Sequence, residues 1–131
     1  MNLGFSTMNY QDLILSSIPY FAQGRLKKEN ALLQRYYANF GDIRAFNGEN
    51  WIEGDLQGYQ MRVSCSGPLG VSFPTVTLLN VLIHETYIHQ WDSYTRNRPC
   101  YMVPKRWTSQ HTFAYVLCQM EIWIAEYEKW L

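Results

Sequence analysis

The clearest alternation in the chain is Tyr59-Gln60-Met61-Arg62-Val63-Ser64-Cys65, in which every second side chain is apolar. A period of two places those side chains on one face of a β-strand. Shorter runs of the same texture lie at residues 42–46 and 51–53, and they are separated by Asn47-Gly48, Gly54-Asp55 and Ser66-Gly67-Pro68. Because Gly and Asn tolerate positive φ, we predict turns at these positions and a small antiparallel sheet within residues 41–74.

On both sides of this sheet, apolar residues repeat at helical spacing. We predict two N-terminal helices, over residues 10–22 and 24–40, and a C-terminal helix capped by Ser109. Residues 74–96 open with Pro74-Thr75 and carry apolar residues almost all round a helix, which predicts a long, buried central helix. The predicted fold class is α+β, with a small antiparallel sheet packed against that buried helix and with N- and C-terminal helices.

Length and composition indicate a single globular domain. The 131 residues suit one domain, residues 1–131, and 47% hydrophobic with 17% charged residues is a globular composition. Lys and Arg together number 11, as do Asp and Glu, so no net field attracts polyanions or anionic membranes. No apolar run approaches the roughly 20 residues of a membrane span. The first ten residues lack a basic segment followed by an apolar stretch, so we expect a cytoplasmic location.

The three cysteines carry no metal or disulfide pattern. Cys65, Cys100 and Cys118 are odd in number and have no CxxC spacing. We therefore expect reduced cysteines that behave as small hydrophobic residues.

The strongest chemical signal is the crowding of His84, Glu85 and His89 in the predicted central helix. Ionisable groups inside a buried helix need partners, and a divalent cation suits two imidazoles. The common zinc-protease motif spaces its histidines by four, whereas here the spacing is five, which separates them by about 140° on a regular helix.

Two geometries remain open for this segment. In one, a single-residue π-bulge between Glu85 and His89 restores the facing histidine pair. In the other, the helix is regular, and Glu85, His89 and Asp92 form a stripe that could bind the metal of a hydrolase. His111, 22 positions after His89, is available as a third ligand, and catalytic zinc takes three protein ligands and a water.

The segment from Leu79 to Trp91, together with His111 and Phe113, resembles the SprT-like zinc metallopeptidases. The resemblance implies a zincin-like site with Zn²⁺ held by His84, His89 and His111, and with Glu85 as general base. The implied activity is peptide hydrolysis, in which zinc lowers the pKa of its bound water and Glu85 takes the proton.

A rival interpretation makes the chain a non-catalytic interaction protein. Ten Tyr and five Trp can bind a protein partner through exposed aromatic anchors. A nucleic-acid partner is a weaker possibility, because the only concentrated positive residues are Arg96, Arg98, Lys105 and Arg106.

Overall fold

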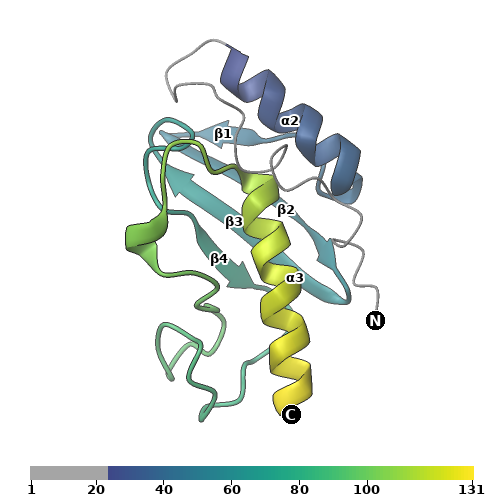
Figure 1. Cartoon of the computed structure of the whole chain (residues 1–131), viewed down its shortest axis with the longest axis vertical. Helices are drawn as coiled ribbons and strands as arrows, with labels where there is room; N and C mark the ends of the chain where they lie inside the picture. The colour runs from purple at the N-terminus through teal and green to yellow at the C-terminus, as the bar shows by residue number, and fades with distance from the viewer. Residues whose placement is uncertain (1–23) are drawn as a thin grey trace.

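A computed structural model describes residues 24–131 of the chain. Its elements are, in order, α2 (Gly24–Tyr36), η2 (Ala38–Phe40), β1 (Arg44–Phe46), β2 (Glu49–Leu56), β3 (Tyr59–Ser66), β4 (Thr75–Leu78), η3 (Pro104–Arg106) and α3 (Phe113–Trp130). The four strands form one antiparallel sheet in the order β1-β2-β3-β4, so the predicted α+β class is confirmed (Figure 1). The helix predicted over residues 24–40 corresponds to α2 and η2, whereas the helix predicted over residues 10–22 lies outside the described residues.

Two tight hairpin turns set the register of the sheet. Asn47 and Gly48 have φ of 50° and 76°, which confirms the turn predicted there between β1 and β2. The second turn is at Gln57-Gly58, with φ of 56° and 90°, and it joins β2 to β3. Positive φ at both central residues matches the right-handed twist of the flanking strands.

The turn predicted at Gly54-Asp55 is wrong, because both residues lie inside β2. Gly54 is needed there for packing: a Cβ on it would stand 2.7 Å from the ring of Phe40, which lies against this strand. Gly54 therefore marks a close approach between a strand and an aromatic ring, and not a turn.

The sheet has one apolar and one polar face. Its inner face carries Ile52, Leu56, Tyr59, Met61, Val63, Cys65, Val76 and Leu78, all of them buried. On the outer face, the Arg62 guanidinium lies over the Trp51 ring at 4.6 Å and reaches Glu49 and Glu53 at 3.4 and 3.5 Å. This alternation is the expected result of a sheet with one face packed on the core and the other in water.

Helix α3 crosses the inner face of the sheet (Figure 1). Its predicted apolar stripe is buried as expected, through Phe113, Val116, Leu117, Met120, Trp123, Ile124 and Tyr127. The predicted cap is wrong by three residues: the helix is capped by Thr112, whose side chain accepts a hydrogen bond from the Tyr115 N–H. Within residues 24–131, neither α3 nor any other helix is long and apolar enough to span a membrane.

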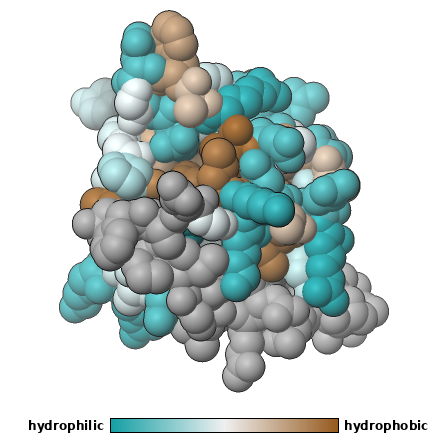
Figure 2. Space-filling model, turned by 90° about the horizontal axis from the view of Figure 1, so that it is seen from above, coloured by the Kyte–Doolittle hydropathy of each residue, from teal (hydrophilic) through white to brown (hydrophobic). Residues whose placement is uncertain are grey.

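Helix α2 holds the start of α3 through a buried ion pair. Arg25 and Glu29 are each 2% exposed, and their side chains meet at 2.8 Å. Glu29 accepts the Phe113 N–H at 2.8 Å, while Arg25 donates to the carbonyl oxygens of Ser109 and His111. Figure 2 views the molecule from this α2 end, where the face of the described residues is mostly hydrophilic with hydrophobic residues near its middle.

The predicted central helix over residues 74–96 is wrong. Its first residues form β4, in which Val76 and Leu78 point inward while Thr75 and Thr77 point outward. β-branched residues favour such a strand, and β3 offers a free edge for pairing. The remainder belongs to an irregular segment, residues 79–103, which we call the long loop. The apolar residues that would surround a helix therefore belong to a strand, in which inward and outward side chains alternate, and to the loop that follows it.

The structure describes all three cysteines. Cys65 and Cys118 are buried, Cys100 is partly buried, and none of the three forms a disulfide. Burial raises the pKa of the Cys65 thiol to about 11, so this side chain stays neutral and packs as an apolar group.

Candidate functional site

The long loop is folded back on itself by main-chain hydrogen bonds. The Ile83 N–H donates to the Arg96 carbonyl at 2.7 Å, and the Cys100 N–H donates to the His89 carbonyl at 3.0 Å. The base of the loop is closed by a bond from the Leu78 N–H to the Asn97 carbonyl. A loop with this many internal partners has a defined conformation without regular secondary structure.

Polar side chains explain why this segment turns instead of forming a helix. The Gln90 side-chain amide donates to the carbonyls of His84 and Tyr87 at 2.9 and 2.8 Å. The Asp92 carboxylate accepts the N–H groups of Tyr94 and Thr95 at 2.9 and 2.8 Å. The bond from Thr95 also lowers the pKa of Asp92. Such local bonds offer the backbone an alternative to helical pairing.

Helix α3 anchors the loop at two points. The Trp123 indole N–H donates to the His89 carbonyl at 2.8 Å, and the Tyr127 hydroxyl accepts the His84 N–H at 2.8 Å. Tyr87 is buried against the same helix, with its ring 4.8 Å from that of Tyr127. The tip of the loop is thereby held against the C-terminal half of α3.

A cavity of about 280 Å³ lies where this loop meets the last turns of α3. It is lined by Thr86, Tyr87, Ile88, His89, Glu126 and Trp130. We call it the aromatic pocket, because the rings of Tyr87 and Trp130 stand 5.0 Å apart and those of Tyr87 and His89 5.6 Å apart. Sequence reasoning did not find Glu126 or Trp130, although their spacing of four on a correctly predicted helix places them on one face.

His84, Glu85 and His89 are exposed residues of the long loop. The His84 ring lies 5.4 Å from that of Trp130, and its Nδ1 accepts a bond from the Thr86 N–H at 3.2 Å. The helix that was to present these three residues is absent, so neither the π-bulge nor the regular stripe of Glu85, His89 and Asp92 is formed. In the stripe interpretation Asp92 was a ligand, whereas here its carboxylate accepts the loop's own N–H groups.

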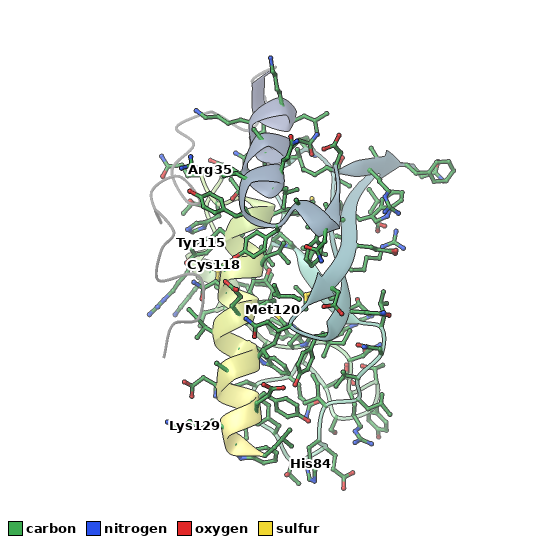
Figure 3. The ribbon with its side chains drawn as sticks, turned by 90° about the vertical axis from the view of Figure 1, so that its right-hand side faces the viewer. Arg35, His84, Tyr115, Cys118, Met120 and Lys129 are labelled. Atoms are coloured by element: carbon green, nitrogen blue, oxygen red, sulfur yellow. The ribbon has the colours of Figure 1, made fainter. Side chains whose placement is uncertain are left out.

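His111 lies at the opposite end of α3 from the other two histidines. Its ring stacks on Tyr115 at 4.5 Å, at the first turn of the helix, while His84 contacts Trp130 at the last turn. Figure 3 shows Tyr115 and His84 near the two ends of α3. The 18 residues of α3 span about 27 Å. His111 therefore does not join His84 and His89 around one ion.

The zinc assignment has no geometric support from these positions. Among residues 24–131, no three or more His, Cys, Asp or Glu side chains are grouped so that they could hold a metal ion. Zinc binding, peptide hydrolysis and the role of Glu85 as general base stay predictions.

The pH dependence of stability is expected to involve His111. Burial lowers the pKa of its imidazole, and its Nδ1 accepts the Thr108 N–H at 3.0 Å. The unfolded chain binds the proton at its ordinary pKa of about 6.5, so His111 stabilises the fold above that value. This contribution is lost as the pH falls through the lowered pKa of the folded state.

Urea unfolding at about pH 7.5 and about pH 5.5 measures this effect. His111→Asn keeps a hydrogen-bond acceptor but does not titrate, so its stability should fall less on acidification than that of the wild type. His84→Asn, at an exposed position, serves as the control and should keep the wild-type difference. An equal loss in all three proteins would contradict the role of His111.

The four basic residues Arg96, Arg98, Lys105 and Arg106 have different surroundings. The Arg96 side chain donates to the Ile83 carbonyl at 2.7 Å and supports the loop. Arg98 lines a second cavity, of about 320 Å³, with Phe73, Trp91 and Pro104. Lys105 and Arg106 are exposed on η3. Nucleic-acid binding by these four residues stays a prediction.

The fold and the site together define a two-layer α+β domain with an aromatic pocket built by a long loop on its C-terminal helix. Comparison of the chain with protein-family models, with curated proteins and with solved structures finds no significant match.

Proposed function

We propose that this chain is a non-catalytic protein-interaction module that binds a partner polypeptide through the long loop and the last turn of α3. The observation that carries the proposal is the exposure of large apolar side chains there. Six of the twelve exposed large hydrophobic residues in the described part of the chain lie in the long loop: Leu79, Leu82, Ile88, Trp91, Tyr94 and Val103. Two more, Trp130 and Leu131, follow at the end of α3.

The degree of exposure supports this proposal. Ile88 is 81% exposed and Tyr94 is 94% exposed, although nearby Ile83 and Tyr87 are buried. Single exposed apolar residues are common, but a concentration on one element marks an interaction site more often than chance. Trp and Tyr are also enriched among the few residues that supply most of the binding energy at protein interfaces.

The defined conformation of the long loop also favours binding. The bonds made by Gln90, Asp92 and Arg96 hold the exposed side chains on a fixed backbone. Since a preformed surface loses less conformational entropy on association, more of the contact energy appears as affinity.

Site-specific photocross-linking tests the proposal. A photoreactive amino acid is placed at Ile88 in the loop, or at Ser66 on the outer face of the sheet as control. In cells that naturally express the protein, we expect the Ile88 probe to capture a discrete polypeptide that the Ser66 probe does not. Ile88→Asp should then weaken binding of that purified polypeptide by about tenfold or more, because it buries a charge at the interface.

Two results would overturn the proposal. One is the same capture profile from both probes. The other is zinc-dependent peptide cleavage that disappears in both His89→Ala and Glu85→Gln, which would support the metallopeptidase prediction instead.

A further inference from the structure

The aromatic pocket has a mixed chemical character. Glu126 and Trp130 are four residues apart on α3, so their side chains lie next to each other on one face of the helix. Trp130 is 47% exposed and presents its indole to the pocket, while Tyr87 closes the inner side. The pocket thus combines apolar ring surfaces with one carboxylate.

The charges of the described residues around the pocket favour a negative electrostatic potential. Burial raises the pKa of Tyr87, and the negative charge of Glu126 raises it further, as expected if that carboxylate acts on the pocket wall. The C-terminal end of α3 adds a partial negative charge, and aromatic faces are also electron-rich. Among residues 24–131, no Lys or Arg lines the cavity. In Figure 3, Lys129 projects from the side of α3 away from the sheet, whereas His84 lies below the last turn.

The size of the pocket limits its occupant. A volume of about 280 Å³ is just below the range of roughly 300–1,000 Å³ that is usual for drug-sized ligands and cofactors. It suits a single side chain of a bound polypeptide. A negative pocket with aromatic walls selects a cationic one.

We propose that the aromatic pocket binds an arginine side chain of the partner polypeptide, with the guanidinium stacked on Trp130 and hydrogen-bonded to the Glu126 carboxylate. This inference rests on the proposed function for its source of arginine, but not for the chemistry of the pocket.

Arginine fits better than lysine for two reasons. Its planar guanidinium is weakly hydrated, stacks on aromatic rings and donates two parallel bonds to a carboxylate. A lysine ammonium is strongly hydrated and needs acceptors for three protons. The described side chains of the wall offer few acceptors besides the Glu126 carboxylate; one is the oxygen of the Thr86 hydroxyl, which itself donates to His84 Nδ1 at 3.0 Å.

The inference is tested directly by adding N-acetyl-arginine amide to the whole chain and monitoring the NMR signals of the protein during the titration. We expect saturable shifts of the Trp130 indole N–H and of the amides of residues 86–89. N-acetyl-citrulline amide, which is nearly isosteric but neutral, should give no saturable shift, and the lysine compound should bind more weakly. Glu126→Gln should reduce arginine affinity by about tenfold, as for loss of a charge-assisted bond.

Glu128→Gln is the matched control, because it removes the same charge from the same helix. The Glu128 carboxylate accepts a bond from the Tyr59 hydroxyl at 3.2 Å and does not line the pocket, so arginine affinity should be unchanged. Trp130→Ala should abolish binding, and the exposed Glu126→Gln exchange keeps the inference testable if Trp130→Ala does not fold.

The outcomes separate the two proposals. Equal binding of arginine and citrulline, or unchanged affinity in Glu126→Gln, would overturn the arginine pocket, even if the Ile88 probe captured a partner. Arginine binding without any captured polypeptide would overturn the interaction module instead. Loss of partner binding in Glu126→Gln, but not in Glu128→Gln, supports both.

Discussion

Replacement of Glu29 by alanine is expected to lower the free energy of unfolding by about 3–5 kcal/mol, as is typical when one member of a buried ion pair is removed. Arg25, only 2% exposed, would lose the Glu29 carboxylate that now lies at 2.8 Å. The Phe113 N–H at the start of α3 would lose its acceptor. Urea unfolding followed by circular dichroism measures the change.

The chemistry of Glu29 explains why the effect is large. Burial raises its pKa, against the opposing influence of the Arg25 charge and of the Phe113 N–H. The pair is therefore costly to desolvate, and removal of Glu29 takes a carboxylate away from a guanidinium that stays buried. Glu29→Gln keeps an oxygen for the Phe113 N–H, so we expect a smaller loss than for alanine.

Gln34→Ala is the control for Glu29→Ala, because Gln34 is exposed on the same helix. Its loss should stay below about 1 kcal/mol. If Glu29→Ala cost no more than Gln34→Ala, the buried pair would not hold α2 to α3.

Replacement of Ile124 by alanine is expected to cost about 2–5 kcal/mol, because it leaves a cavity in a closely packed core. Ile124 has no exposed surface and lies on the face of α3 that contributes to the apolar core. The same exchange at Ile122, which is 37% exposed on the same helix, should cost below about 1 kcal/mol.

Ile122→Ala is the control for Ile124→Ala, since the residue type, the helix and the substitution are identical and only the burial of the side chain differs. Thermal and urea unfolding of both proteins give the comparison. Equal losses would contradict the assignment of Ile124 to the core, and with it the packing of α3 on the sheet.

The sheet and α3 could be predicted because their patterns are local. The alternating residues 59–65 bury all their apolar side chains only as a β-strand. Asn47 and Gly48 have the positive φ that their turn requires. The apolar stripe from Phe113 to Tyr127 extends over several turns of α3. The buried face of the helix is therefore predicted correctly even though the predicted N-cap is three residues too early.

The pattern over residues 74–96 was ambiguous. Val76 and Leu78 suit a strand or a buried helix equally well, and only the free edge of β3 selects the strand. Gly54 is ambiguous in the same way, since the Phe40 ring that requires a glycine there is distant in sequence. These residues interact with partners that the local sequence does not identify.

The candidate site depended even more on tertiary structure. The sequence by itself determined the α+β class, the hairpin at Asn47-Gly48 and the buried face of α3, because each follows from local conformational preference or periodicity. Only the tertiary structure placed His84 beside Trp130, kept His111 at the other end of α3, and brought Glu126 to the pocket of Tyr87. The physical reason is that the long loop has no period of its own: side-chain hydrogen bonds and its anchors Trp123 and Tyr127 determine its path, and these form only once the core has assembled.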